Sequence, residues 1–121
     1  MTITTRDDPG RHDRERVDGN DVDLAVVTMR FDASDAGGLH AVLSKYVVLA
    51  RMVDGCRNVD LCVSTTRPGR ILIIQKWDDA DAQRRHFDSP LMVEMAESCD
   101  GLLAAAPEID LWDGLSAHDL R

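Results

Sequence analysis

The chain has 121 residues, and its 14 Lys and Arg against 22 Asp and Glu give it a formal net charge of −8. Its 44% apolar fraction suits one small domain with a buried core and excludes disorder throughout. The negative charge without a basic cluster argues against a nucleic-acid partner, and the lack of a long apolar stretch argues against a membrane partner or a secretion signal, so we expect a cytoplasmic location.

Two terminal segments are expected to lie outside the folded domain. Residues 1–21 carry four arginines and six acidic residues with almost no apolar side chain, a composition typical of a disordered tail. Residues 115–121 are expected to form a short polar tail at the other end. The domain itself is therefore expected over residues 22–114.

The first half of this domain reads as a strand followed by a helix. Residues 22–31 alternate in polarity, which predicts a strand with Val27 and Met29 on one face. Residues 39–53 carry an apolar stripe at helical spacing. Tyr46 lies on that stripe, so we expect its ring in the core and its hydroxyl at the rim.

A hairpin is predicted next. Residues 56–65 and 70–77 have strand patterns, and the Arg67-Pro68-Gly69 turn between them makes the two strands antiparallel. Cys56 and Cys62 lie six residues apart in one strand, which places them on the same face at about 20 Å. That separation is too long for a disulfide, so structural thiols are expected.

The second half of the domain contains a broken helical arm and a last strand. Asp78 or Asp79 can cap a short helix through Phe87, and Ser89-Pro90 can open a second helix that runs to about Ala105. Residues 107–114 then predict a short strand. The order of elements indicates an α+β fold, the ferredoxin-like βαββαβ arrangement with an antiparallel sheet and helices on one face.

The strand over residues 70–77 also predicts a protein partner. Ile71, Leu72, Ile73 and Ile74 follow one another without alternation, so both faces of the sheet need to be covered there. Helices on one face leave the other bare. We therefore expect a homodimer that pairs sheet to sheet through a two-fold contact.

Several short motifs in the segment 53–90 resemble the antibiotic biosynthesis monooxygenase family of dimeric α+β barrel proteins. The matching residues are Gly55-Cys56 at the start of the second strand, Trp77 at the end of the third, Ala82 and His86 on the next helix, and Ser89-Pro90. The resemblance implies a dimeric α+β barrel that binds a small aromatic substrate and O2.

The resemblance also implies a site. Trp77 and His86 would be its catalytic residues, with Trp77 lining a cavity between sheet and helices and His86 assisting proton transfer. The expected pocket around them is apolar and contains no metal ligands; it comprises Val27, Met29, Leu43, Ile73, Gln75 and Phe87. The simpler interpretations are that Trp77 is an ordinary core residue and that His86 is an exposed helix residue.

Family members differ in their chemistry, so the resemblance leaves alternatives open. The first is cofactor-independent oxygenation of a small quinol or polycyclic phenol, although Ile73 and Gln83 stand where anthrone-oxidising members have an Asn and a Tyr. The second is haem binding and degradation with His86 as iron ligand, although Val27 or Thr28 stands where those members have an Asn. The third is a small-molecule-binding dimer without catalysis.

Overall fold

The computed structural model describes residues 24–116. The tail expected at residues 1–21 and most of the tail expected at residues 115–121 lie outside the described residues. Within the described part, no helix is long and apolar enough to cross a bilayer.

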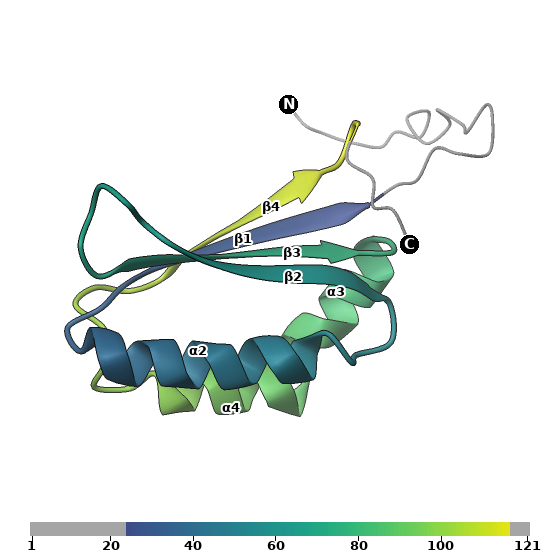
Figure 1. Ribbon diagram of the computed structural model, residues 1–121. Coiled ribbons are helices and arrows are strands. Elements are labelled where there is room, and N and C mark those ends of the chain that lie inside the picture. Colours follow the sequence, from purple (N-terminus) through teal and green to yellow (C-terminus); the bar gives the residue numbers. More distant parts are fainter. Residues whose placement is uncertain (1–23, 117–121) are drawn as a thin grey trace.

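Four strands and three helices make up the described domain. In chain order they are β1 (Ala25–Asp32), α2 (Ala36–Ala50), β2 (Cys56–Val63), β3 (Arg70–Trp77), α3 (Ala80–Phe87), α4 (Pro90–Ser98) and β4 (Glu108–Asp113). The strands form one antiparallel sheet in the order β2-β3-β1-β4, and the helices lie against one face of it (Figure 1). This confirms the predicted ferredoxin-like fold, with α3 and α4 together in the second helical position.

Side-chain oxygens cap the N-termini of α3 and α4. Asp79 accepts a hydrogen bond from the Ala82 amide at 2.8 Å at the start of α3, and Ser89 caps α4 with Pro90 as its first residue. The Ser89 cap was predicted from the sequence, and Asp79 is one of the two caps, Asp78 or Asp79, that the sequence left open. The prediction that the second helix continues to about Ala105 was wrong. α4 ends at Ser98, because the chain turns at Gly101, whose φ is +82°.

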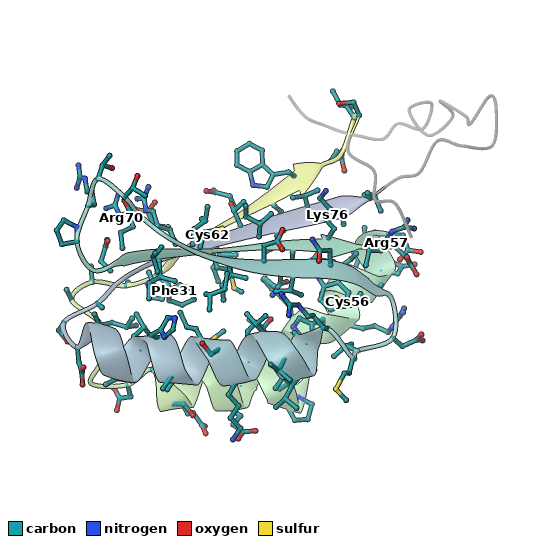
Figure 2. All side chains as sticks on the ribbon, viewed as in Figure 1. Phe31, Cys56, Arg57, Cys62, Arg70 and Lys76 are labelled. Atoms are coloured by element: carbon teal, nitrogen blue, oxygen red, sulfur yellow. The ribbon has the colours of Figure 1, made fainter. Side chains whose placement is uncertain are left out.

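The two faces of the sheet differ in burial. Residues directly opposite one another in an antiparallel pair share a face, so Ile71 and Ile73 lie with Phe31 and Met29 on the inner face, under the helices. All four are buried. Figure 2 shows Phe31 on this inner side, and Cys62, Arg70 and Lys76 on the outer side. The outer-face side chains of Val26, Leu72 and Ile74 are only half-buried; no helix covers them.

Cys56 and Cys62 lie on opposite faces, which corrects the expectation that they share one. Cys56 is opposite Trp77 on the inner face, whereas Cys62 is opposite Leu72 on the outer face. The register shifts between Cys56 and Asn58, so one extra residue changes the side to which the later side chains point. All three cysteines lie within the described residues, and none of them forms a disulfide.

Gly55 joins the sheet to α3 at one corner of the domain. Its φ is +88°, a value that residues with a side chain rarely adopt. A Cβ at residue 55 would also lie only 2.7 Å from the Cβ of Ala82. Its carbonyl accepts the Asp78 amide proton at 2.8 Å. The turn before β2 therefore approaches α3 closely because residue 55 has no side chain.

Candidate functional site

The structure brings three of the predicted site residues, Gln75, Trp77 and His86, together at one end of the layer between sheet and helices. Met29 and Ile73 pair with each other farther along the inner face. Gln75 and Trp77 project from the end of β3, and His86 projects from α3 toward them. Of the predicted pocket residues, Phe87 is half-buried and the others are buried, namely Val27, Met29, Leu43, Ile73 and Gln75.

Trp77 and His86 are in direct ring contact. Their ring centroids lie 4.5 Å apart with an interplanar angle of 30°. Trp77 is 0% exposed and His86 is 1% exposed, so the interpretation of His86 as an exposed helix residue was wrong. Asp79 caps the start of α3 two residues after Trp77. His86 lies about two helical turns farther along α3, and this spacing places its imidazole against the indole.

A chain of hydrogen bonds runs through the same site. The Trp77 indole Nε1 donates to Gln75 Oε1 at 3.0 Å, and Gln75 Nε2 donates in turn to the Tyr46 hydroxyl. The Tyr46 oxygen lies 2.7 Å from His86 Nε2 and 3.4 Å from Met92 Sδ. Four elements, α2, β3, α3 and α4, therefore converge on one buried phenol.

Tyr46 is the residue of this candidate site that the sequence analysis missed. The helical stripe correctly placed its ring in the core, but its hydroxyl lies inside the domain, bonded to Gln75 and His86, and not at the rim. The partners are 29 and 40 residues away in sequence. Tyr46 is the only tyrosine in the chain, and its position on a buried stripe was the one available signal.

His86 holds one polar atom that no group within residues 24–116 satisfies. Its Nδ1 is buried and has no hydrogen-bond partner. Burial lowers the pKa of His86 to about 4, so the imidazole is neutral at physiological pH. Burial also raises the pKa of Tyr46, which keeps its proton. The site is therefore uncharged at physiological pH. Its side chains are largely aromatic, and His86 Nδ1 is its unsatisfied polar atom.

A groove on the helix layer borders this site at Tyr46. It lies between α2 and α4, has a volume of about 260 Å³ and has Tyr46 among its lining residues. Most of its lining is apolar, contributed by Val42, Leu49, Leu91 and Met95. Lys45 and Glu94 face each other across it, with Nζ and Oε2 3.7 Å apart, and both side chains are largely exposed.

The described residues do not fit a metal or haem. No group of three or more potential His, Cys, Asp or Glu ligands comes together within them. For haem, His86 Nε2 is already bonded to Tyr46, and the whole imidazole is 1% exposed and packed against Trp77, which leaves no room for a macrocycle beside a ring nitrogen. Val27 offers no polar group, and Thr28 lies on the outer face, where it accepts from Trp112. We therefore derive no chemistry through haem.

Known proteins share this fold and this region of sequence. The family model for antibiotic biosynthesis monooxygenases matches residues 24–98. Among curated proteins, no sequence matches.

Solved structures of similar fold come from several bacteria. SnoaB, a cofactor-independent oxygenase from Streptomyces nogalater, is 19% identical with a TM-score of 0.68, over 82% of this chain and 97% of its own. Rv0793 from Mycobacterium tuberculosis is 25% identical with a TM-score of 0.68, over 80% and 97%. PA3566 from Pseudomonas aeruginosa is 22% identical with a TM-score of 0.70, over 78% and 96%.

Proposed function

The chain belongs to the antibiotic biosynthesis monooxygenase family, and from that premise we propose that it is a cofactor-independent monooxygenase that oxidises a small quinol or polycyclic phenol with O2. The observation that carries the proposal is the buried Trp77–His86 stack with its unsatisfied Nδ1. Aromatic surface and one free polar atom are what a flat phenol requires from a dry site. SnoaB, of similar fold, is a cofactor-independent oxygenase.

The proposed reaction needs no outside reductant. A ring carbon of the deprotonated phenol passes one electron to O2, and the two radicals combine to a peroxide on that carbon. Cleavage of the O–O bond leaves one oxygen as a carbonyl and releases the other as water. The substrate loses four electrons and O2 gains four, so a quinol and O2 give a hydroxyquinone and H2O.

The side chains would contribute position and electric field in this reaction. The Trp77 indole lies against the imidazole and supplies an aromatic wall. His86 supplies a polar atom for the oxygen of the substrate, where negative charge develops, in surroundings from which water is excluded. Groups of this kind typically account for about 10²-fold or more of a rate enhancement.

The groove between α2 and α4 is the access route that we propose for the substrate. Its apolar lining and its Tyr46 floor suit an aromatic ring, and the exposed Lys45–Glu94 pair at its mouth opens at little cost. Its volume of about 260 Å³ is below the range of sites for drug-sized ligands. A substrate of one or two fused rings fits this limit better than a larger polycycle.

Oxygen uptake tests the proposed activity. Purified protein should consume O2 with at least one member of a panel of benzo- and naphthohydroquinones, at a rate above autoxidation. His86→Ala should lose about 10²-fold in kcat/KM. His40→Ala is the matched control, because His40 is exposed on α2, and it should keep full activity. Binding of quinols without any uptake would leave a small-molecule-binding protein instead.

We further propose that the protein forms a homodimer through the outer face of the sheet. Val26, Leu72 and Ile74 form a half-buried apolar strip there, and Trp112 is 54% exposed beside it on β4. Apolar area of this kind favours association. Sedimentation of the full chain at micromolar concentration should give a dimer, and Ile74→Asp should give a monomer. A monomeric wild-type chain contradicts the proposal.

A further inference from the structure

The direction of the hydrogen bonds in the buried chain can be worked out from its first donor. An indole nitrogen can only donate, so the Gln75 atom that faces Trp77 must be the amide oxygen. The amide nitrogen then points to Tyr46 and donates to the hydroxyl oxygen. The orientation of Gln75, which could otherwise be reversed, is fixed by its neighbour.

The proton of Tyr46 must therefore go to a third group. The candidates are His86 Nε2 at 2.7 Å and Met92 Sδ at 3.4 Å. An imidazole nitrogen is a strong acceptor and a thioether sulfur is a weak one, so the proton is directed to Nε2. The distance of 2.7 Å is typical of a hydroxyl donor.

This assignment determines the tautomer of His86. A neutral imidazole carries one proton, and if Nε2 accepts from Tyr46, that proton is on Nδ1. The unsatisfied buried atom is then an N–H donor. A buried donor without a partner is costly, and the groups that satisfy it best are negatively charged oxygens.

We infer that His86 Nδ1–H is a binding site for the anionic oxygen of a phenolate, and that Tyr46 is a positioning residue that holds His86 in this tautomer. The inference rests on the proposed function only for the identity of the phenolate as substrate. It assigns His86 the role of a donor that stabilises the substrate anion. The phenol loses its proton to solvent before the anion enters the site, from which water is excluded.

The tautomer can be measured without any substrate. In protein labelled with ¹⁵N-histidine, long-range proton–nitrogen correlation at pH 7 should show His86 with a protonated Nδ1 and a bare Nε2, assigned by loss of the signal in His86→Gln. Tyr46→Phe keeps the ring and removes the hydroxyl, so Nε2 should become at least partly protonated. Met92→Leu is the matched control and should leave the tautomer unchanged.

Two results of this measurement would overturn the inference. One is a wild-type His86 whose proton resides on Nε2. The other is a Tyr46→Phe protein that is folded and has the wild-type tautomer, since Tyr46 would then have no positioning role. If Tyr46→Phe does not fold, the wild-type and Met92→Leu spectra still decide which atom accepts the Tyr46 proton.

Binding of the anion is tested with 4-nitrophenol, a phenol whose anion is coloured and which is not a quinol. At a pH one unit below its solution pKa, protein in excess should increase the absorbance of the phenolate, because the donor stabilises that form. His86→Leu should remove at least half of the increase. No binding, or binding as the neutral phenol only, contradicts the anion site. Failure of quinol oxidation with these results intact would reject the proposed function alone.

Discussion

The inner face of β3 has two ends that are equally buried but chemically different. At one end Ile71 and Ile73 lie opposite Phe31 and Met29, and every contact is apolar. At the other end Trp77 donates to Gln75 and Gln75 donates to Tyr46 on α2. The Tyr46 hydroxyl is in turn hydrogen-bonded to His86 on α3. The apolar end stabilises the domain by removing apolar surface from water. The polar end must instead form hydrogen bonds that compensate for the hydration free energy its polar groups lose when they are buried.

This difference indicates where a ligand-binding site can form in so small a domain. The polar end satisfies Trp77 Nε1 and both ends of the Gln75 amide, yet leaves His86 Nδ1 without a partner among the residues that the structure describes. A core built only for stability would fill this position with an apolar side chain. The unsatisfied atom indicates that a ligand would bind at this end of β3.

The largest effect is expected at the apolar end. Ile73→Ala should lower the free energy of unfolding by about 2 to 5 kcal/mol, because it leaves a cavity in a closed core. Ile109→Ala on β4 makes the same chemical change at a side chain that is 45% exposed, and should cost less than about 1 kcal/mol. Urea unfolding followed by circular dichroism measures both. Equal losses would contradict the packing described for β3.

The polar end should add a pH dependence that the apolar end lacks. The pKa of His86 is about 4 in the folded protein against an ordinary value of 6.5, so between these values the unfolded state binds the additional proton. Stability should therefore fall as pH decreases through this window, by at most about 1.4 kcal/mol per pH unit. Urea unfolding at pH 7, 6 and 5 should show a shallower decrease for His86→Gln than for the wild type.

Gln75→Leu should show what the hydrogen bonds contribute. The change keeps a similar volume but deprives Trp77 Nε1 of its acceptor and Tyr46 of a donor, which should cost about 1 to 3 kcal/mol. The tryptophan fluorescence should also change, because Trp77 loses its partner. An unchanged unfolding midpoint in urea would indicate that this network does not stabilise the fold.

The smallest effect is expected for Met92→Leu. The two side chains have similar volumes, and the sulfur contact with the Tyr46 hydroxyl at 3.4 Å is weak, so the loss should be below about 1.5 kcal/mol. Oxygen uptake with a quinol should remain within a factor of about three of wild type. A loss as large as that of Gln75→Leu would mean that the sulfur is the main acceptor of the hydroxyl proton.

Much of the fold could be predicted because its signals are local. Strand alternation placed Gln75 and Trp77 on the same face as Ile71 and Ile73, and the Asp79 and Ser89 caps fixed where α3 and α4 begin. These features depend on residues within a few positions of one another. The short sequence motifs were likewise sufficient for the family, which the match over residues 24–98 supports.

The parts of the site that were missed depend on long-range geometry. The bulge at Cys56/Asn58 is invisible in the alternation of β2, and it reverses the face of every side chain on one side of it. The contacts of Tyr46 with Gln75 and His86 join three separate elements. No periodicity within one helix indicates which partner a buried hydroxyl will meet.

Gly55 has a consequence for how any mutational survey of this protein is interpreted. The turn that it forms lies against Ala82, one helical turn before His86 on α3. A methyl group at residue 55 would push the start of that helix outward and separate the two rings. In a mutational screen that measures turnover, substitutions of Gly55 would therefore be as damaging as substitutions of Trp77 or His86. Gly55 would have this effect only because it sets the distance between those two side chains.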